Sequence, residues 1–137
     1  MSDPRDLADR YVALWIEPDP DRRCQTIRDL FASDGSHLLQ PPRGLSDAAA
    51  ALGFVPTLRA HGYAALEVRV THAYEEFVAP GQLTFRLRDE PVRLGDVVKF
   101  TWEMVPTGGG DAVGAGLEVL LVDEGGRILV DHQFIVG

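Results

Sequence analysis

A tyrosine on the apolar face of a predicted helix could take part in proton transfer. Tyr11 lies in "ADRYVALWIEPD", and together with Trp15 and the preceding Leu7 it falls on one apolar stripe at helical spacing. A phenol in an apolar cavity can donate a hydrogen bond to a carbonyl oxygen that gains negative charge. The alternative is a core tyrosine that is bonded to a backbone carbonyl.

A glutamate and a histidine later in the chain could complete such a site. Glu118 lies in the apolar run "GAGLEVLLV", where an ionised carboxylate is costly unless it is paired or neutralised. Burial would raise its pKa and make it a donor, whereas a salt bridge or a solvent-facing position is the alternative. His37 lies on a short predicted strand, and a neutral imidazole there could act as a general base. A structural hydrogen bond is the plainer interpretation of His37.

Other polar groups suggest less chemistry. His72 continues an apolar row and could face inward, whereas His132 is predicted to lie at an interface. No H-x-H, H-x-x-x-H or H-E-x-x-H spacing occurs, so we predict no metal and no cofactor. The "TGGGD" run lacks a following helix or lysine and is predicted to be a hairpin loop rather than a phosphate site.

Length and charge restrict the class of protein. The chain has 137 residues, which fits a single domain over residues 1–137. Its formal net charge of −8 repels phosphate backbones and anionic lipids, so we predict neither a nucleic-acid nor a membrane partner. No apolar run is long enough to span a bilayer, and the single Cys24 fits a reducing compartment. We therefore expect a cytoplasmic protein.

Capping signals predict two helices at the start of the chain. Ser2 or Asp3 can cap a helix with Pro4 near its first position, and Asp19 followed by proline repeats the signal. The second helix should carry an apolar face that includes Phe31 and end near Gly35. A third helix is predicted from Ser46, with an apolar stripe that continues to Leu58 past a kink at Pro56.

The hydrophobic period changes to two in the second half of the chain. A brief strand is predicted at "GSHLLQPP", and from Ala65 the alternation of Leu66, Val68 and Val70 with polar residues predicts a strand. Further predicted strands are "QLTFRLR", "DVVKFTWEMV", "AVGAGLEVLLVD" and "RILVDHQFIV". Helices followed by hairpin-linked strands indicate an α+β domain, in which helices pack on one face of a mostly antiparallel sheet.

The last two predicted strands are apolar on both faces. A sheet with helices on one side only should be polar on the other. We therefore expect a homodimer that covers the outer face of the sheet.

The order of elements resembles the NTF2-like superfamily, a curved-sheet cone that includes ketosteroid isomerase and SnoaL-like polyketide cyclases. The resemblance covers nearly the whole chain, and its carriers are "RYVALW", "LFASDGSHL", "FTWEMV" and "GLEVLLVDEGGRI". It implies three N-terminal helices packed on a curved sheet that surrounds an apolar pocket.

Ketosteroid isomerase can be compared residue by residue. The resemblance places its oxyanion-hole tyrosine on Tyr11 and its protonated oxyanion-hole carboxyl on Glu118, whereas its general-base position falls on Leu39 or Gln40. His37 is then the best available base. Trp15 joins the residues expected to line the pocket, and the resemblance implies the others: Val98, Phe100, Trp102, Met104, Asp131 and Gln133.

Two functions from different classes follow from the resemblance. The first is a SnoaL-like domain that binds a hydrophobic small molecule and performs cofactor-free isomerase-type or cyclase-type acid/base chemistry on a carbonyl compound. The second is a non-catalytic ligand-binding or dimerisation module with the same fold, which accounts for the missing carboxylate base.

Overall fold

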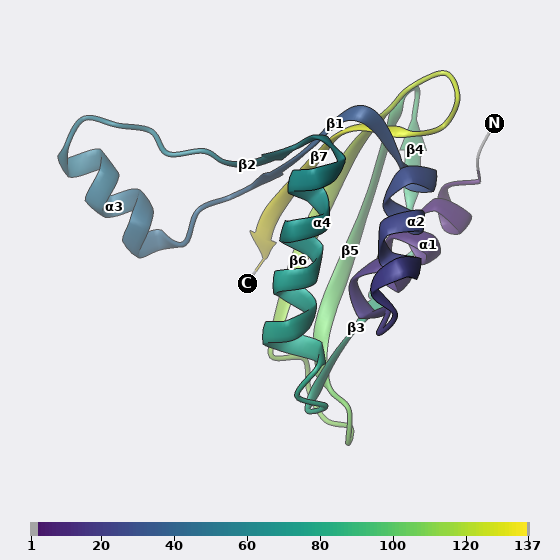
Figure 1. Ribbon diagram of the computed structural model, residues 1–137. Coiled ribbons are helices and arrows are strands. Elements are labelled where there is room, and N and C mark those ends of the chain that lie inside the picture. The colour runs from purple at the N-terminus through teal and green to yellow at the C-terminus, as the bar shows by residue number, and fades with distance from the viewer. Residues whose placement is uncertain (1–2, 137) are drawn as a thin grey trace.

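A computed structural model describes residues 3–136, and its first two helices begin at the predicted caps (Figure 1). Helix α1 spans Pro4–Ile16, and the side chain of Asp3 accepts a hydrogen bond from the backbone N–H of Arg5. Helix α2 spans Pro20–Leu30, and Asp19 caps it in the same way. Both starts are confirmed for these caps, whereas Ser2 lies outside the described residues.

Strand β1 begins four residues before Gly35, the predicted end of the second helix. It spans Phe31–Leu39 directly after α2, so the placement of Phe31 on a helical face was wrong. The pairing of β1 with the last strand shifts between Phe31 and Ser36. A Cβ on Gly35 would lie 2.9 Å from the carbonyl oxygens of Ala32 and Ile128. Gly35 therefore marks a close approach inside the sheet rather than a helix end.

The sheet has seven strands in the order β2-β1-β7-β6-β5-β3, with β4 paired to β5, and its edge strand β2 spans Leu58–His61. All its pairs are antiparallel except β1 with β7, which run parallel. The predicted strands after residue 80 are confirmed, and β4 is additional. Their bounds are β3 Leu83–Leu87, β4 Val92–Leu94, β5 Val97–Pro106, β6 Gly114–Val122 and β7 Ile128–Val136.

The strand predicted from Ala65 is wrong, because residues Gly62–Ala73 form helix α4, which continues into a π-helical turn over Tyr74–Val78. Its buried residues Leu66, Val70 and Ala73 recur at helical spacing. Val68, which lies between Leu66 and Val70 in the alternating row that suggested a strand, is 71% exposed. Tertiary packing here outweighs the β-propensity of the valines.

Helix α3 stands away from the rest of the molecule, at the end of an arm between β1 and β2 (Figure 1). It spans Arg43–Ala51, and strand β2 spans Leu58–His61, so the predicted third helix begins earlier and ends earlier than expected. None of its residues is buried, and Val55 beyond it is 93% exposed. The predicted apolar stripe therefore does not face the core of this chain.

Helices α1, α2 and α4 cover one face of the sheet (Figure 1). The predicted α+β class with helices on a mostly antiparallel sheet is confirmed, although the third packed helix is α4 rather than α3. The core lies between these layers and joins fully buried residues of all three helices to the sheet: Leu7, Leu14, Ile27, Leu30, Leu66, Phe100, Leu120 and Ile128. None of the helices within residues 3–136 is long and apolar enough to cross a membrane.

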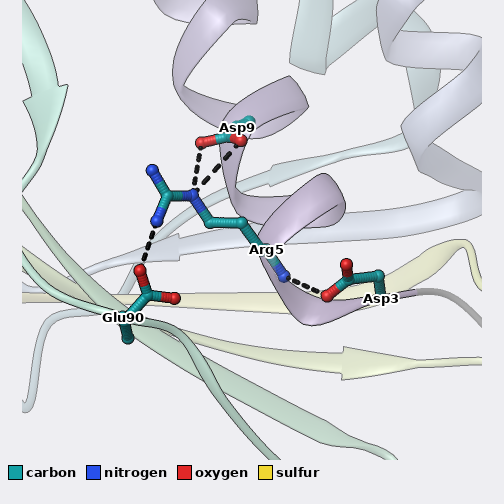
Figure 2. Close-up of polar contacts among 4 residues, drawn as sticks. All are labelled: Asp3, Arg5, Asp9 and Glu90. Carbon is teal, nitrogen blue, oxygen red and sulfur yellow. Dashed lines mark hydrogen bonds and ion pairs between the residues drawn. The ribbon is translucent and has the colours of Figure 1, made fainter.

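A polar network holds the start of α1 against the loop between β3 and β4 (Figure 2). The Arg5 Nε donates to Asp9 at 3.1 Å, and its Nη1 donates to Glu90. All of these side chains are exposed, and exposed ion pairs add little stability. The network therefore orients the start of α1, whereas burial of the apolar stripe supplies most of the stability of its packing.

The outer face of the sheet carries apolar rows with no helix on them. In the strand register, Val97, Leu121 and Val130 form one row, and Leu117 lies beside Phe134 in another. Phe134 is 45% exposed. We propose that a second copy of the chain covers this face, as the sequence led us to expect.

Replacing Val119 with Asp should convert such a dimer to monomers and lower its thermal stability. Val119 lies at the centre of the outer face, between Lys99 and His132. Obligate interfaces commonly bury about 2,000 Å² or more, and a charge inside one is costly. Sedimentation velocity at micromolar concentration measures the change. Val68→Asp, a matched change on the exposed face of α4, should leave assembly intact, and a monomeric wild-type protein would contradict the proposal.

Candidate functional site

A cavity of about 210 Å³ lies between the helices and the inner face of the sheet. We call it the central cavity. Most of its lining is apolar or aromatic, and side chains from α1, α4 and four strands surround it. The lining residues are Tyr11, Val12, Trp15, Leu39, Arg69, Ala73, Phe77, Phe85, Trp102, Met104 and Gln133.

Tyr11 connects the central cavity to a buried carboxyl. Its hydroxyl, which is fully buried, donates to Oδ2 of Asp131 on β7 at 2.5 Å. Its ring packs edge-on against Phe100, with 5.4 Å between ring centroids, and this contact fixes its orientation. Burial and the neighbouring carboxyls raise the pKa of Tyr11 well above its ordinary value. The phenol is therefore neutral, and its proton is held on the side of Asp131.

A second carboxyl lies beside Asp131. Glu118 on β6 is fully buried, and the Nε1 of Trp102 donates to its Oε1 at 2.8 Å. We call Glu118 and Asp131 the carboxyl pair. Burial, followed by the charge of Asp131 and a hydrogen bond to it, raises the pKa of Glu118 well above its ordinary value. Glu118 is therefore the protonated member.

Each carboxyl of this pair has one oxygen without a partner among the described residues, Oε2 of Glu118 and Oδ1 of Asp131. Two ionised carboxylates cannot bond to each other, whereas a protonated Glu118 can donate to Asp131. A shared proton therefore accounts for both oxygens. The resulting hydrogen-bonded chain links Trp102, Glu118, Asp131 and Tyr11, and Asp131 accepts from both Glu118 and Tyr11, which faces the central cavity.

His37 lies behind the central cavity rather than on its wall. It is 1% exposed, and its Nε2 lies 3.0 Å from Oε1 of Gln133 and 3.7 Å from Oδ2 of Asp131. Because an amide oxygen only accepts, the Nε2 carries the hydrogen and donates to Gln133. Gln133 lines the cavity, so it stands between His37 and any ligand.

Only some of the predicted pocket residues line the central cavity. Trp15, Trp102, Met104 and Gln133 line the central cavity. Val98 and Phe100 share the inner face of β5 but are buried in the core and do not belong to the lining. The remaining predicted residue, Asp131, is fully buried behind Tyr11.

Arg69 is a site residue that the sequence interpretation missed. It lies on α4 and lines the central cavity. Its segment was assigned to a strand, in which it fell on the polar, outward row. The spacing of Leu66 and Val70 was the signal that could have found it. Residues four apart also lie on one face of a helix, and Arg69 lies next to that face.

His72 and His132 lie outside the site. The His72 side chain is 74% exposed on α4, so the inward orientation considered for it is wrong. His132 lies on the outer face of the sheet, where its Nδ1 is 3.0 Å from the carbonyl oxygen of Val119.

His37, Glu118 and Asp131 also have the donor types of a divalent-cation site, with one ligand atom of each within 4.8 Å of the others. One atom of each residue is already engaged, by Gln133, Trp102 and Tyr11 respectively. The raised pKa of Glu118 also opposes the ionised form that a metal needs. This arrangement therefore favours a shared proton over a cation.

Gly116 on β6 leaves the space that the Trp102 ring occupies. Gly116 pairs with Trp102, and a Cβ on Gly116 would lie 2.3 Å from a ring carbon of that indole. The ring is also held edge-on by Phe85, with 5.2 Å between centroids. Any side chain at Gly116 must therefore displace the indole from its position over β6.

Replacing Gly116 with Ala should break the hydrogen bond from Trp102 to Glu118 and shift the tryptophan emission. The added methyl group displaces the indole ring, and the displaced Nε1 no longer lies within hydrogen-bond distance of the Glu118 carboxyl. The measurement is fluorescence in a Trp15→Phe background, together with the NMR shift of the Trp102 indole N–H. Gly114→Ala is the matched control on the same strand, because a Cβ there meets nothing within 4 Å. Equal spectra for both variants would contradict the predicted displacement.

Solved structures share this architecture over almost the whole chain. A candidate isomerase of the SnoaL-like family from Agrobacterium tumefaciens superposes with a TM-score of 0.76 at 22% identity, covering 96% of each chain. An NTF2-like protein of unknown function from Exiguobacterium gives a TM-score of 0.62 at 15% identity, covering 95% of this chain and 98% of that one. A candidate polyketide cyclase from Sinorhizobium meliloti gives a TM-score of 0.59 at 15% identity, covering 94% of each.

The sequence comparisons add no closer relationship. No protein-family model matches the chain. No curated protein matches it either. At these identities the structural likeness shows the fold, and the predicted NTF2-like cone is confirmed.

Proposed function

We propose that this chain, which has the NTF2-like fold of its SnoaL-like structural neighbours, binds a small hydrophobic carbonyl compound in the central cavity and performs cofactor-free acid/base chemistry on it. One observation carries the proposal. The cavity-lining hydroxyl of Tyr11 is backed at 2.5 Å by the fully buried Asp131, which lies beside a protonated Glu118.

The carboxyl pair would let Tyr11 act as an acid toward a ligand. When a ligand oxygen gains negative charge, the proton of Glu118 moves to Asp131, and Asp131 then donates to the Tyr11 oxygen. The Tyr11 hydroxyl turns to donate to the ligand oxygen, which lowers the energy of the charged state. The negative charge that remains on Glu118 is stabilised by the Trp102 indole N–H.

His37 is the proposed base, and it acts through its neighbours. Its ring nitrogen reaches Gln133, which lines the cavity, and lies 3.7 Å from Asp131. Because this Nε2 carries a hydrogen and donates it to Gln133, it could accept a proton from a ligand only after Gln133 moves and the hydrogen passes to the other ring nitrogen, Nδ1. The proposed role of His37 as a base therefore also predicts a movement of Gln133.

A non-catalytic binding module is the second candidate, and the make-up of the cavity wall favours it. Among the described residues that line the cavity, none is a carboxylate or a histidine. Such a wall can hold and polarise a ligand without removing a proton from it. The chain would then retain the fold and the pocket but lack a base that reaches the ligand.

A panel of small hydrophobic ketones and enones tests both candidates. Thermal shift identifies the compounds that bind, and deuterium exchange or isomerisation followed by NMR identifies the compounds that react. Binding with turnover supports acid/base chemistry, and binding without turnover supports the module. A panel in which no compound shifts the unfolding temperature would contradict both.

A further inference from the structure

The central cavity contains a cation that has no counter-ion. Arg69 is the one charged residue among the described residues that line it. Its Nε is buried and has no hydrogen-bond partner, and within residues 3–136 its guanidinium forms no ion pair. By contrast, Arg28 and Arg86 on the protein surface each pair with a glutamate at 2.6 Å.

A second donor of the same cavity is also unsatisfied. The Nε1 of Trp15 is buried and has no partner, and the Arg69 guanidinium carbon lies 5.3 Å from the centroid of the Trp15 ring. Buried donors in native proteins are nearly always paired, so two neighbouring exceptions indicate a missing acceptor. That acceptor would lie between α1 and α4, where both side chains meet the cavity.

The other polar groups of the lining do not supply it. The Oε1 of Gln133 already accepts from His37, and the Tyr11 hydroxyl is engaged with Asp131. The rest of the wall is apolar or aromatic. A ligand that fits this wall therefore has an apolar body and one negatively charged group that accepts hydrogen bonds. A single guanidinium with one neighbouring N–H matches a planar carboxylate, which takes two parallel hydrogen bonds from arginine.

From these contacts we infer that the ligand of the central cavity is a small apolar carboxylic acid, bound as its carboxylate by Arg69 and Trp15. The inference rests on the proposed function for the place of the ligand and defines its chemical class. The carboxylate lies at the α1–α4 side, and a second oxygen of the same molecule faces Tyr11. A cavity of about 150 Å³ holds benzene, so about 210 Å³ accommodates one ring with a short acidic chain.

The matched probes are phenylacetate and phenylacetamide, which have the same shape and differ in charge. Isothermal titration calorimetry should show that the wild-type protein binds the acid about 10- to 100-fold more tightly than the amide, because a hydrogen bond to a charged group is worth that much when buried. Arg69→Gln should lower the affinity for the acid to about that for the amide, and the uncharged amide should lose much less affinity than the acid. Arg69→Lys should keep part of the preference for the acid, because the charge remains without the planar fork.

Arg22→Gln is the control, since this side chain is 75% exposed and is not among the residues that line the cavity. It should bind both probes like the wild type. Circular dichroism and thermal unfolding establish that each variant is folded. Equal wild-type affinity for acid and amide, an equal loss of both in Arg69→Gln, or no binding of either probe would overturn the inference.

The inference and the proposed chemistry fail in different experiments. Charge-selective binding of the acid without any reaction of keto or enone acids would support the ligand class and contradict catalysis. Turnover of neutral ketones together with equal binding of the two probes would support catalysis and contradict the ligand class.

Discussion

Replacing Tyr11 with Phe should lower turnover of a reactive carbonyl compound by about 10²- to 10³-fold, the usual cost of removing one donor to a developing oxyanion. The substitution deletes the hydroxyl that joins the central cavity to Asp131 and leaves the ring packing on Phe100 in place. Ligand affinity should change much less than the rate, because the hydroxyl acts mainly on the charged state. Steady-state kinetics with the reactive compound separates the two effects.

Tyr63→Phe is the matched control for this loss. The Tyr63 hydroxyl donates to the backbone carbonyl of Phe31 at 3.0 Å and does not line the central cavity. It should therefore cost some stability and leave the rate unchanged. If the two variants lose activity equally, Tyr11 has only a structural role and the binding-module function gains support.

Local signals predicted most of the fold correctly. Asp3 and Asp19 cap helices through contacts that lie within two residues of each, so their effect is visible in a short window of sequence. The later strands are predicted from apolar runs that turn residues separate, although the last two strands are apolar on both faces. Helix α4 was missed because Leu66 and Val70 fit both a period of two and a helical turn, and only the packed structure decides between them.

The site was less visible in the sequence, because long-range pairing assembles it. Helical periodicity pointed to Tyr11 and an apolar run pointed to Glu118, and the structure places both beside Asp131. The partner of Tyr11 is 120 residues away in the chain, and the parallel pairing of β1 with β7 brings His37 opposite Asp131. No local pattern encodes that register. The unpaired state of Arg69 is likewise a property of what surrounds it in space.

The stability of the Glu118→Gln variant relative to the wild-type protein should increase as the pH rises. The pKa of Glu118 is raised in the folded state, so folding favours its protonated form. The stabilising contribution of this group is fully present below its unfolded pKa of 4.5 and is lost as the pH rises through the folded value. Between the unfolded and the folded pKa of Glu118, each pH unit lowers the unfolding free energy of the wild-type protein by about 1.4 kcal/mol.

Glutamine tests this argument because it keeps the polar contacts and cannot ionise. Its carbonyl oxygen can accept from the Trp102 indole, and its amide can donate to Asp131, as the protonated acid does. Urea unfolding of both proteins between pH 5 and pH 9 should therefore give a stability difference that shifts toward the variant with increasing pH. Comparing the two proteins at each pH cancels the other titrating groups. A difference that is independent of pH would mean that Glu118 carries the same charge folded and unfolded, and the shared proton beside Asp131 would then be absent.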